Sequence, residues 1–255
     1  MSAILYNYIA ISKRFFLIII GCLFLINHLS GQSVQVAGIF PTIDHSGKIN
    51  DKWNYSFYYF GAFPLAEIKA TEPRSQDKFL LFYSEQALTF SLSSRLSFTG
   101  SYVYQRENVL QNNYVNENRI HLQATFKHQL NTVNFKHRLR MDNRFIENRI
   151  TGKSAYTHRL RYLFGIDFPI KSKKNNLYFV GYEEAFFNTF SKASVFYGEN
   201  WAYAALGISV NTKNKVEAGP LYITWNVGGS NWFHQYYLQV SWISQLDFTS
   251  PKKTN

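Results

Sequence analysis

The chain has very little cysteine. Its single cysteine among 255 residues, Cys22, lies in an N-terminal apolar stretch. Disulfide frameworks, thiol nucleophiles and cysteine metal sites are therefore excluded for the rest of the chain. Neither a Gly-x-Ser-x-Gly nucleophile elbow nor a His-Glu-x-x-His metal motif occurs. We accordingly expect no catalytic residues, no metal and no cofactor.

Long apolar runs are also missing beyond the N-terminal region. A membrane-spanning helix needs about 20 apolar residues, and the one long run, Phe15–Ile26, is shorter. It follows Lys13 and Arg14 and precedes small residues that end at Gly31. This order is typical of a secretory signal, and we expect cleavage near Gly31.

The expected domain organisation follows from this signal. Residues 1–31 are the predicted signal peptide, and residues 32–255 form one exported domain of 224 residues (255 − 31). That length is compatible with a single all-β barrel. If this domain sits in a membrane, it must do so as a closed barrel, because only helices and barrels satisfy their backbone groups in lipid.

The charge balance is basic without the features of a nucleic-acid-binding protein. The formal net charge is +11, or +9 (11 − 2) without Lys13 and Arg14. The remaining basic residues alternate with apolar ones instead of clustering in an arm or helix, and no nucleic-acid motif is present. We expect no nucleic-acid partner.

Strict alternation dominates the sequence that remains. Between Thr132 and Phe145, the even-numbered positions are polar or charged: Thr132, Asn134, Lys136, Arg138, Arg140, Asp142, Arg144. The odd positions are mostly apolar: Val133, Phe135, His137, Leu139, Met141, Asn143, Phe145. A period of two places the two sets on opposite faces of a long β-strand. The same pattern predicts outward Phe98 and Tyr102, and outward Leu238, Val240 and Trp242 near the C-terminus.

Eleven such segments are expected. They are Val34–Ile43, Lys52–Phe63, Lys78–Phe90, Arg95–Arg106, Glu117–Gln129, Thr132–Phe145, Ser154–Phe168, Leu177–Asn188, Glu199–Val210, Lys215–Asn226 and His234–Phe248. Short links are expected to alternate with longer loops, among them Ile146–Lys153 and Val227–Phe233. This is the signature of a closed antiparallel up-and-down transmembrane β-barrel. An even strand number gives 10 strands, with residues 34–43 outside the wall, or 12 with one strand unrecognised.

Charge favours one strand register. With Leu130-Asn131 as a two-residue turn, Arg119 lies opposite Asp142 and Glu117 opposite Arg144. A slip of two residues would oppose like charges, which is unfavourable.

These inward charges form the candidate site. The expected lumen charge cluster comprises Glu85, Glu117, Arg119, Arg138, Arg140, Asp142, Arg144, Arg159, Arg161, Asp167, Glu184 and Glu199. Such charges should pair across a narrow lumen, since an unpaired buried charge is costly. They act either as a salt-bridge plug or as an Arg-lined constriction that attracts anions.

Several segments carry a family resemblance. They read ENRIHLQ, HRLRMDNRF, THRLRYLFGIDFPI, EEAFFN and ENWAYAALGISV. Together they resemble the uncharacterised outer-membrane family known as domain of unknown function 2490. The family pattern maps onto Arg119, Arg138, Arg140, Arg159, Arg161, Glu184, Asn188, Glu199 and Asn200. Trp201 departs from it, where an Arg is usual. The resemblance implies a β-barrel in the outer membrane of a Gram-negative bacterium, and implies no activity.

The sequence thus favours an outer-membrane barrel of structural or narrow, porin-like transport role, selective for anions or small polar solutes. Outer-membrane lipid and the barrel-assembly machinery are the expected partners, with a small anionic solute as ligand. Two alternatives remain open. A lipid-modifying enzyme would need a His and a Ser or carboxylate on adjacent strands near one rim. A soluble secreted ligand-binding barrel would turn its apolar face inward and its Arg face outward.

Overall fold

A computed structural model describes residues 34–69, 80–112, 114–148, 151–170, 176–189, 196–228 and 231–248. The predicted signal peptide lies outside the described residues. In the part of the chain that the structure describes, no helix is long and apolar enough to cross a membrane. The described chain is all β.

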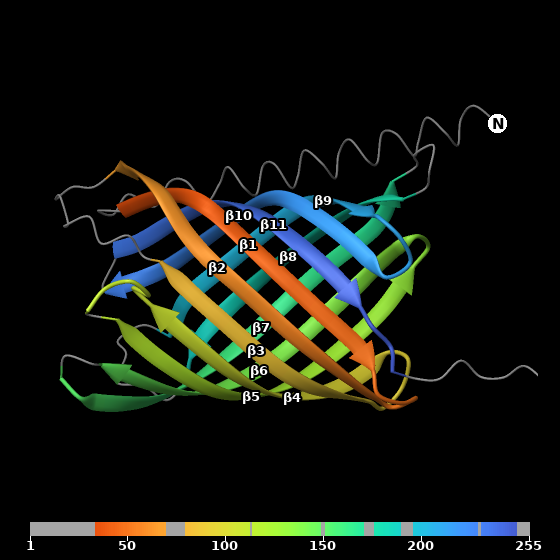
Figure 1. Ribbon diagram of the computed structural model, residues 1–255, viewed down its shortest axis with the longest axis horizontal. Helices are drawn as coiled ribbons and strands as arrows, with labels where there is room; N and C mark the ends of the chain where they lie inside the picture. Colours follow the sequence, from red (N-terminus) through yellow and green to blue (C-terminus); the bar gives the residue numbers. More distant parts are fainter. Residues whose placement is uncertain are drawn as a thin grey trace, which may run out of the picture. The chain divides into compact units, whose positions relative to one another are not determined.

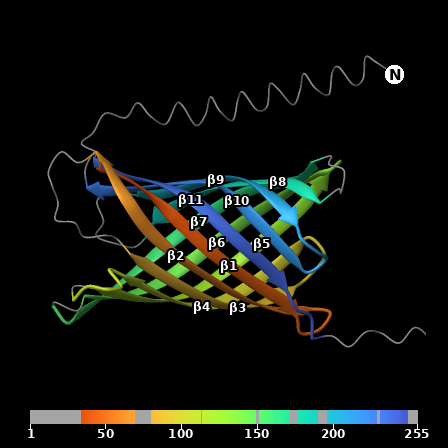
Figure 2. The same cartoon turned by 45° about the horizontal axis from the view of Figure 1, so that its top comes forward.

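Eleven strands make up the described wall (Figures 1 and 2). They are β1 (Val34–Lys48), β2 (Trp53–Lys69), β3 (Leu81–Ser91), β4 (Leu96–Glu107), β5 (Val115–Leu130), β6 (Val133–Asn148), β7 (Lys153–Ile170), β8 (Leu177–Asn188), β9 (Tyr197–Ser209), β10 (Asn214–Gly228) and β11 (Asn231–Gln245). Each strand pairs with its sequence neighbours, and β1 closes the barrel against β11.

The closure corrects the expected strand number. The prediction of 10 or 12 strands is wrong, because β1 belongs to the wall and no twelfth strand lies among the described residues. With an odd number of alternating strands, the first and last run in the same direction. β1 and β11 are accordingly parallel, in register from Val34 opposite Phe233 to Ser46 opposite Gln245. The other described neighbours are antiparallel (Figure 1).

The connections define two rims. The described turns 49–52, 92–95, 131–132 and 210–213 lie at one rim, the short-turn rim, together with the strand ends Ile170 and Leu177. The other, the long-loop rim, is marked by the strand ends Lys69 and Leu81, Glu107 and Val115, Asn148 and Lys153, Asn188 and Tyr197, and Gly228 and Asn231. The predictions of two long loops, Ile146–Lys153 and Val227–Phe233, are wrong. The strands extend into the ranges expected to form these loops, since Asn148 of β6 pairs with Lys153 of β7 and Gly228 of β10 pairs with Asn231 of β11. The contrast between the rims is therefore weaker than the sequence suggested.

The orientation of the side chains follows the predicted alternation. On β6, Leu139 is 49% exposed on the outer face, whereas Asp142 on the inner face is 0% exposed. On β4, Phe98 and Tyr102 are exposed on the outer face, whereas Thr99 and Ser101 on the inner face are buried. On β11 the same holds for the outward set Leu238, Val240 and Trp242. The face assignments on these three strands are confirmed, and the outer surface is apolar.

An aromatic cluster fills one side of the interior. Phe40 of β1 stacks on Phe60 of β2 with ring centroids 4.6 Å apart, and Phe60 stacks on Tyr83 of β3 at 4.4 Å. Trp201 of β9 meets Phe40 edge-on at 5.8 Å, although two strands separate β9 from β1. Such offset and edge contacts are favourable arrangements for aromatic rings. The lumen is therefore apolar on one side, which the expectation of an Arg- and Glu-rich interior did not include.

Candidate functional site

The opposite side of the lumen carries the charges. Inward positions of β5, β6 and β7 supply most of them, and β3, β8 and β9 add three glutamates. Inward residues recur at every second position and the strands pair without bulges from β3 to β7, so the charged groups of neighbouring strands lie in adjacent rows of the lumen wall. The result is a network of ion pairs with little contact with solvent.

Glu117 on β5 is the acceptor for two arginines. Arg144 on β6 donates to it from Nη2 at 2.8 Å, and Arg119 donates from Nη2 at 3.1 Å and also from Nε. Arg119 further donates to the side-chain oxygen of Gln105. Only 3% of the Glu117 side chain is exposed. One buried carboxylate thus accepts charge-assisted hydrogen bonds from two neighbouring guanidinium groups, and such bonds are stronger than neutral ones.

The pairing of β5 with β6 corrects the register that the sequence predicted for these two strands. The expected turn at Leu130-Asn131 would pair Gln129 with Thr132, but Leu130 pairs with Val133 instead. The two turn residues are therefore Asn131 and Thr132. Asn131 has φ of 54°, a left-handed conformation that Asn tolerates better than most residues. The local preference of Asn131 for the turn shifts the whole strand pair by two residues.

The shifted register places like charges face to face. Arg119 lies directly opposite Arg144, and His121 lies opposite Asp142. The predicted pairing of Arg119 with Asp142 is wrong, as is that of Glu117 with Arg144 as direct cross-strand neighbours. Opposed like charges are unfavourable, but Glu117 lies two residues from Arg119 on the same face and binds both guanidinium groups. The diagonal ion pair between Glu117 and Arg144 therefore replaces the direct cross-strand ion pair that the sequence predicted.

Asp142 and Glu184 connect three further arginines. Arg159 and Arg161 of β7 approach Asp142 at 3.3 and 3.5 Å. Arg161 also reaches Glu184 of β8 at 2.9 Å, and Arg138 of β6 reaches the same carboxylate at 2.7 Å. The ring of Phe186 lies beneath Arg159 and Arg161, 4.7 and 4.3 Å from their guanidinium carbons. Cation–π contact adds to the ion pairing of these buried groups.

Two bonds join the charged side to the aromatic side. The Tyr83 hydroxyl donates to Glu85 at 2.7 Å, and the indole N–H of Trp201 donates to Glu199 at 2.6 Å. Glu85 of β3 also pairs with Arg140 of β6 at 3.4 Å, a contact that reaches across the barrel interior past β4 and β5. Glu199 pairs with Arg159 at 2.7 Å. Side chains from well-separated strands therefore meet inside the lumen.

Eleven of the twelve predicted site residues take part in this network. They are Glu85, Glu117, Arg119, Arg138, Arg140, Asp142, Arg144, Arg159, Arg161, Glu184 and Glu199. Asp167 is the exception: it lines the same lumen but accepts a hydrogen bond from Asn134 at 2.8 Å. Tyr83, Gln105 and Trp201 were missed, although the alternation that identified the charges would also have placed them inward.

Two Ser–His pairs occur among the described residues. His121 is hydrogen-bonded to Ser101 and lies 3.9 Å from Asp142, but all three are buried and none lines the cavity. His45 and Ser244 lie on the outer face of β1 and β11, with Nδ1 and Oγ 2.8 Å apart. No cluster of three or more potential metal ligands lies in the described part of the chain.

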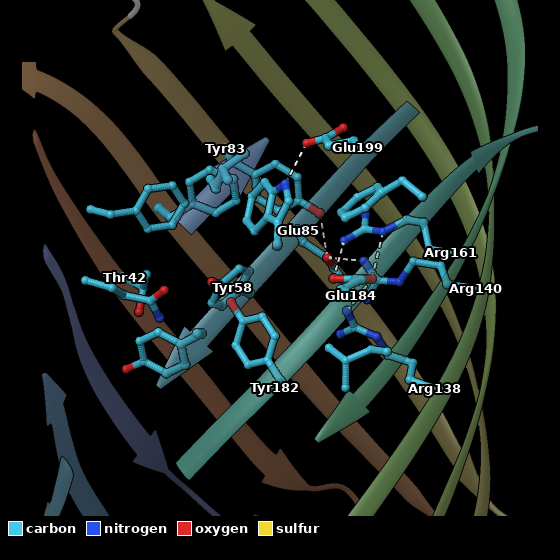
Figure 3. Close-up of a pocket in the computed structure, with 18 of the residues that line it drawn as sticks. Thr42, Tyr58, Tyr83, Glu85, Arg138, Arg140, Arg161, Tyr182, Glu184 and Glu199 are labelled. Atoms are coloured by element: carbon cyan, nitrogen blue, oxygen red, sulfur yellow. Dashed lines mark hydrogen bonds and ion pairs between the residues drawn. The ribbon is translucent and has the colours of Figure 1, made fainter. Parts of the chain in front are cut away.

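The space between the two sides is a cavity of about 720 Å³. Figure 3 shows Arg138, Arg140 and Arg161 reaching into it from one side, with Thr42, Tyr58 and Tyr83 on the other side. The cavity lies within the range of about 300–1,000 Å³ found for small-molecule sites. It is bordered by fixed charges and by aromatic faces.

Fold and interior together define a closed β-barrel with an ion-paired lumen. The chain matches the family model described as "Protein of unknown function (DUF2490)" over residues 37–234, which is more than half of its length. The protein therefore belongs to this family, as its sequence resemblance indicated. The match runs from β1 into β11 and so spans the barrel wall. No curated protein matches the chain significantly.

Proposed function

We propose that this protein is an outer-membrane β-barrel of structural or narrow transport role, closed to free diffusion and admitting small anionic or polar solutes. The apolar outer face supports membrane insertion, because lipid-facing strand positions in such barrels are apolar and their lumen is polar. The short-turn rim would face the periplasm, where the turns of these barrels are short.

The proposal that the lumen is closed to free diffusion rests on one ion pair. The Glu85–Arg140 pair links β3 to β6 inside the lumen, over the inner faces of β4 and β5, and its members are 8% and 5% exposed. A buried ion pair is costly to break because each charge would lose its partner in a medium of low dielectric constant. We infer that this pair and the ion pairs around it narrow the lumen, so that removing the pair opens a path for ions.

Planar-bilayer conductance of the refolded barrel tests this proposal. We expect the wild type to show no long-lived open channel. Replacing both partners, Glu85→Ala with Arg140→Ala, removes the bridge without changing net charge and should produce discrete conductance steps. The reversal potential should then show anion preference, because Arg138 and Lys136 still line the cavity.

The exposed turn offers a matched control. Asp51→Ala with Lys52→Ala removes one acid and one base at the short-turn rim, where both residues are exposed. This variant should stay silent. A wild-type barrel with stable porin-like conductance would overturn the closed state, and a silent Glu85/Arg140 double variant that has folded would show that another contact closes the lumen.

The outward His45–Ser244 pair favours a second candidate function, acyl transfer on lipid. The Tyr55 hydroxyl donates to the carbonyl oxygen of Leu246 at 2.9 Å, so it accepts from Nε2–H of His45 at 3.1 Å. Nδ1 of His45 is then free to accept the Ser244 hydroxyl proton, which is the role of a general base. No carboxylate is bonded to this pair among the described residues.

Labelling with a fluorophosphonate probe separates the two functions. The closed-barrel proposal predicts that folded protein in lipid vesicles takes up no label. Rapid labelling that Ser244→Ala abolishes, while labelling survives in Ser101→Ala, would instead establish an activated serine on the outer face.

A further inference from the structure

One inward row of residues crosses four neighbouring strands beside the network. Lys136 of β6 lies opposite Gly165 of β7, Gly165 opposite Tyr182 of β8, and Tyr182 opposite Tyr203 of β9. All four line the cavity. Gly165 places no side chain between Lys136 and Tyr182, and a Cβ there would already meet Leu163 Cδ2 at 3.4 Å and Tyr182 Cβ at 3.6 Å.

The charged wall of this space has capacity to bind an anion. Lys136 and Arg138 lie two residues apart on the same face of β6. Arg138 shares Glu184 with Arg161, and its buried Nε has no hydrogen-bond partner. Among the described residues no carboxylate forms an ion pair with Lys136, although Asp44 of β1 lines the same cavity and attracts it at longer range. Lys127 lies directly opposite Lys136. Adjacent like charges repel, so an anion bound between Lys136 and Arg138 would be favoured.

The facing wall offers hydrogen-bonding groups. Tyr237 and Gln239 of β11 are 3% and 5% exposed and line the same cavity. The Tyr237 hydroxyl and the Gln239 side-chain oxygen have no hydrogen-bond partner, since the Gln239 amide donates to Ser241 and leaves its oxygen free. Buried polar groups without a partner are uncommon in folded proteins. A free acceptor oxygen is matched by a hydroxyl donor on a ligand.

We propose that the lumen cavity binds a small hydroxylated anion of the sugar-acid or sugar-phosphate type. Its acidic group lies between Lys136 and Arg138, its ring lies against Tyr58 and Tyr182 (Figure 3), and its hydroxyls meet the β11 wall. Carboxylate and phosphate share the chemistry that guanidinium and ammonium groups recognise. This inference rests on the proposed narrow-transport role, because it names the solute that would be transported. Binding of that solute does not require the barrel to conduct ions.

Isothermal titration of the full refolded barrel in detergent tests the site. The probes are glucuronate, glucose 6-phosphate and uncharged glucose. We expect saturable binding of at least one anion, with glucose about tenfold weaker or worse, the usual worth of one charge-assisted hydrogen bond. Binding of glucuronate alone identifies a sugar acid, and binding of the phosphate alone a sugar phosphate. If a folded barrel binds none of the three, or binds glucose equally well, the proposal is overturned.

Two lysines give a matched pair of variants. Lys136→Gln should weaken anion binding about tenfold, whereas Lys127→Gln, whose residue does not line the cavity, should leave it within about twofold. Equal losses in both would mean that general charge attraction, not the site, holds the anion.

Tyr237→Phe provides a check that does not depend on charge. It removes only a buried hydroxyl without a partner, so the unfolding midpoint should stay the same or rise, while affinity for the bound sugar falls. Unchanged affinity in both Tyr237→Phe and Lys136→Gln would place binding elsewhere. If the wild type is silent in bilayers and also binds no probe, the closed barrel stands and only the site falls.

Discussion

Replacing Glu117 by Gln is expected to destabilise the barrel by about 3–5 kcal/mol, the usual cost of removing one partner from a buried ion pair. Glutamine keeps the shape of the side chain and removes its charge. Arg119 and Arg144 then lie directly opposite each other with no shared carboxylate between them. Urea unfolding of the refolded protein in lipid vesicles measures the change.

A second glutamate serves as the control. Glu147 lies on β6 near the long-loop rim and is exposed. Glu147→Gln should change the unfolding free energy by less than about 0.5 kcal/mol, as surface substitutions usually do. Adding Arg144→Gln to Glu117→Gln should recover part of the loss, because only one guanidinium group then remains. A Glu117→Gln variant as stable as the Glu147→Gln control would mean that the two arginines do not depend on this carboxylate.

The second large effect is expected on the outer face. Leu139 lies near the middle of β6 and is 49% exposed there. If β6 crosses a bilayer, Leu139→Arg should cost about 2–4 kcal/mol, the range for a charge near the midplane. The same unfolding measurement in lipid vesicles gives this value.

A leucine at the end of a strand provides the comparison with Leu139 in the middle of one. Leu130 ends β5 at the short-turn rim and is 64% exposed. Leu130→Arg should cost only about 0–1 kcal/mol, as charges near the membrane interface do. Similar small costs at both positions would favour a barrel that stays in water. Such a soluble barrel would also need its apolar face inward, and the described side chains are arranged the other way.

The sequence determined the faces of the strands. Alternation is a local property: neighbouring side chains of an extended chain must point to opposite sides, whatever the strand pairs with. For that reason Arg140 and Asp142 could be assigned to one face, and Leu139 and Met141 to the other, before any fold was known; the expectation of a membrane barrel placed the charged face inside. Most of the charged site followed from the same rule, whereas the family was indicated by the residues of five sequence segments.

The tertiary structure decided how the strands combine. The register of β5 and β6 depended on the turn at Asn131, and a change of two residues replaced the expected Arg119–Asp142 contact by Arg119 opposite Arg144. Alternation repeats every two residues, so a slip of two leaves every face unchanged and the pattern cannot detect it.

Alternation also could not predict how the barrel closes or which side chains meet inside it, for a related reason. Whether β1 joins the wall depends on how the eleven strands curve and on the partner that β11 offers, which is a property of the whole sheet. The meeting of Trp201 with Phe40, and of Arg140 with Glu85, likewise requires a closed barrel. Local chemistry thus fixed which side chains share a face, whereas strand register and barrel closure together fixed which of them meet in the lumen.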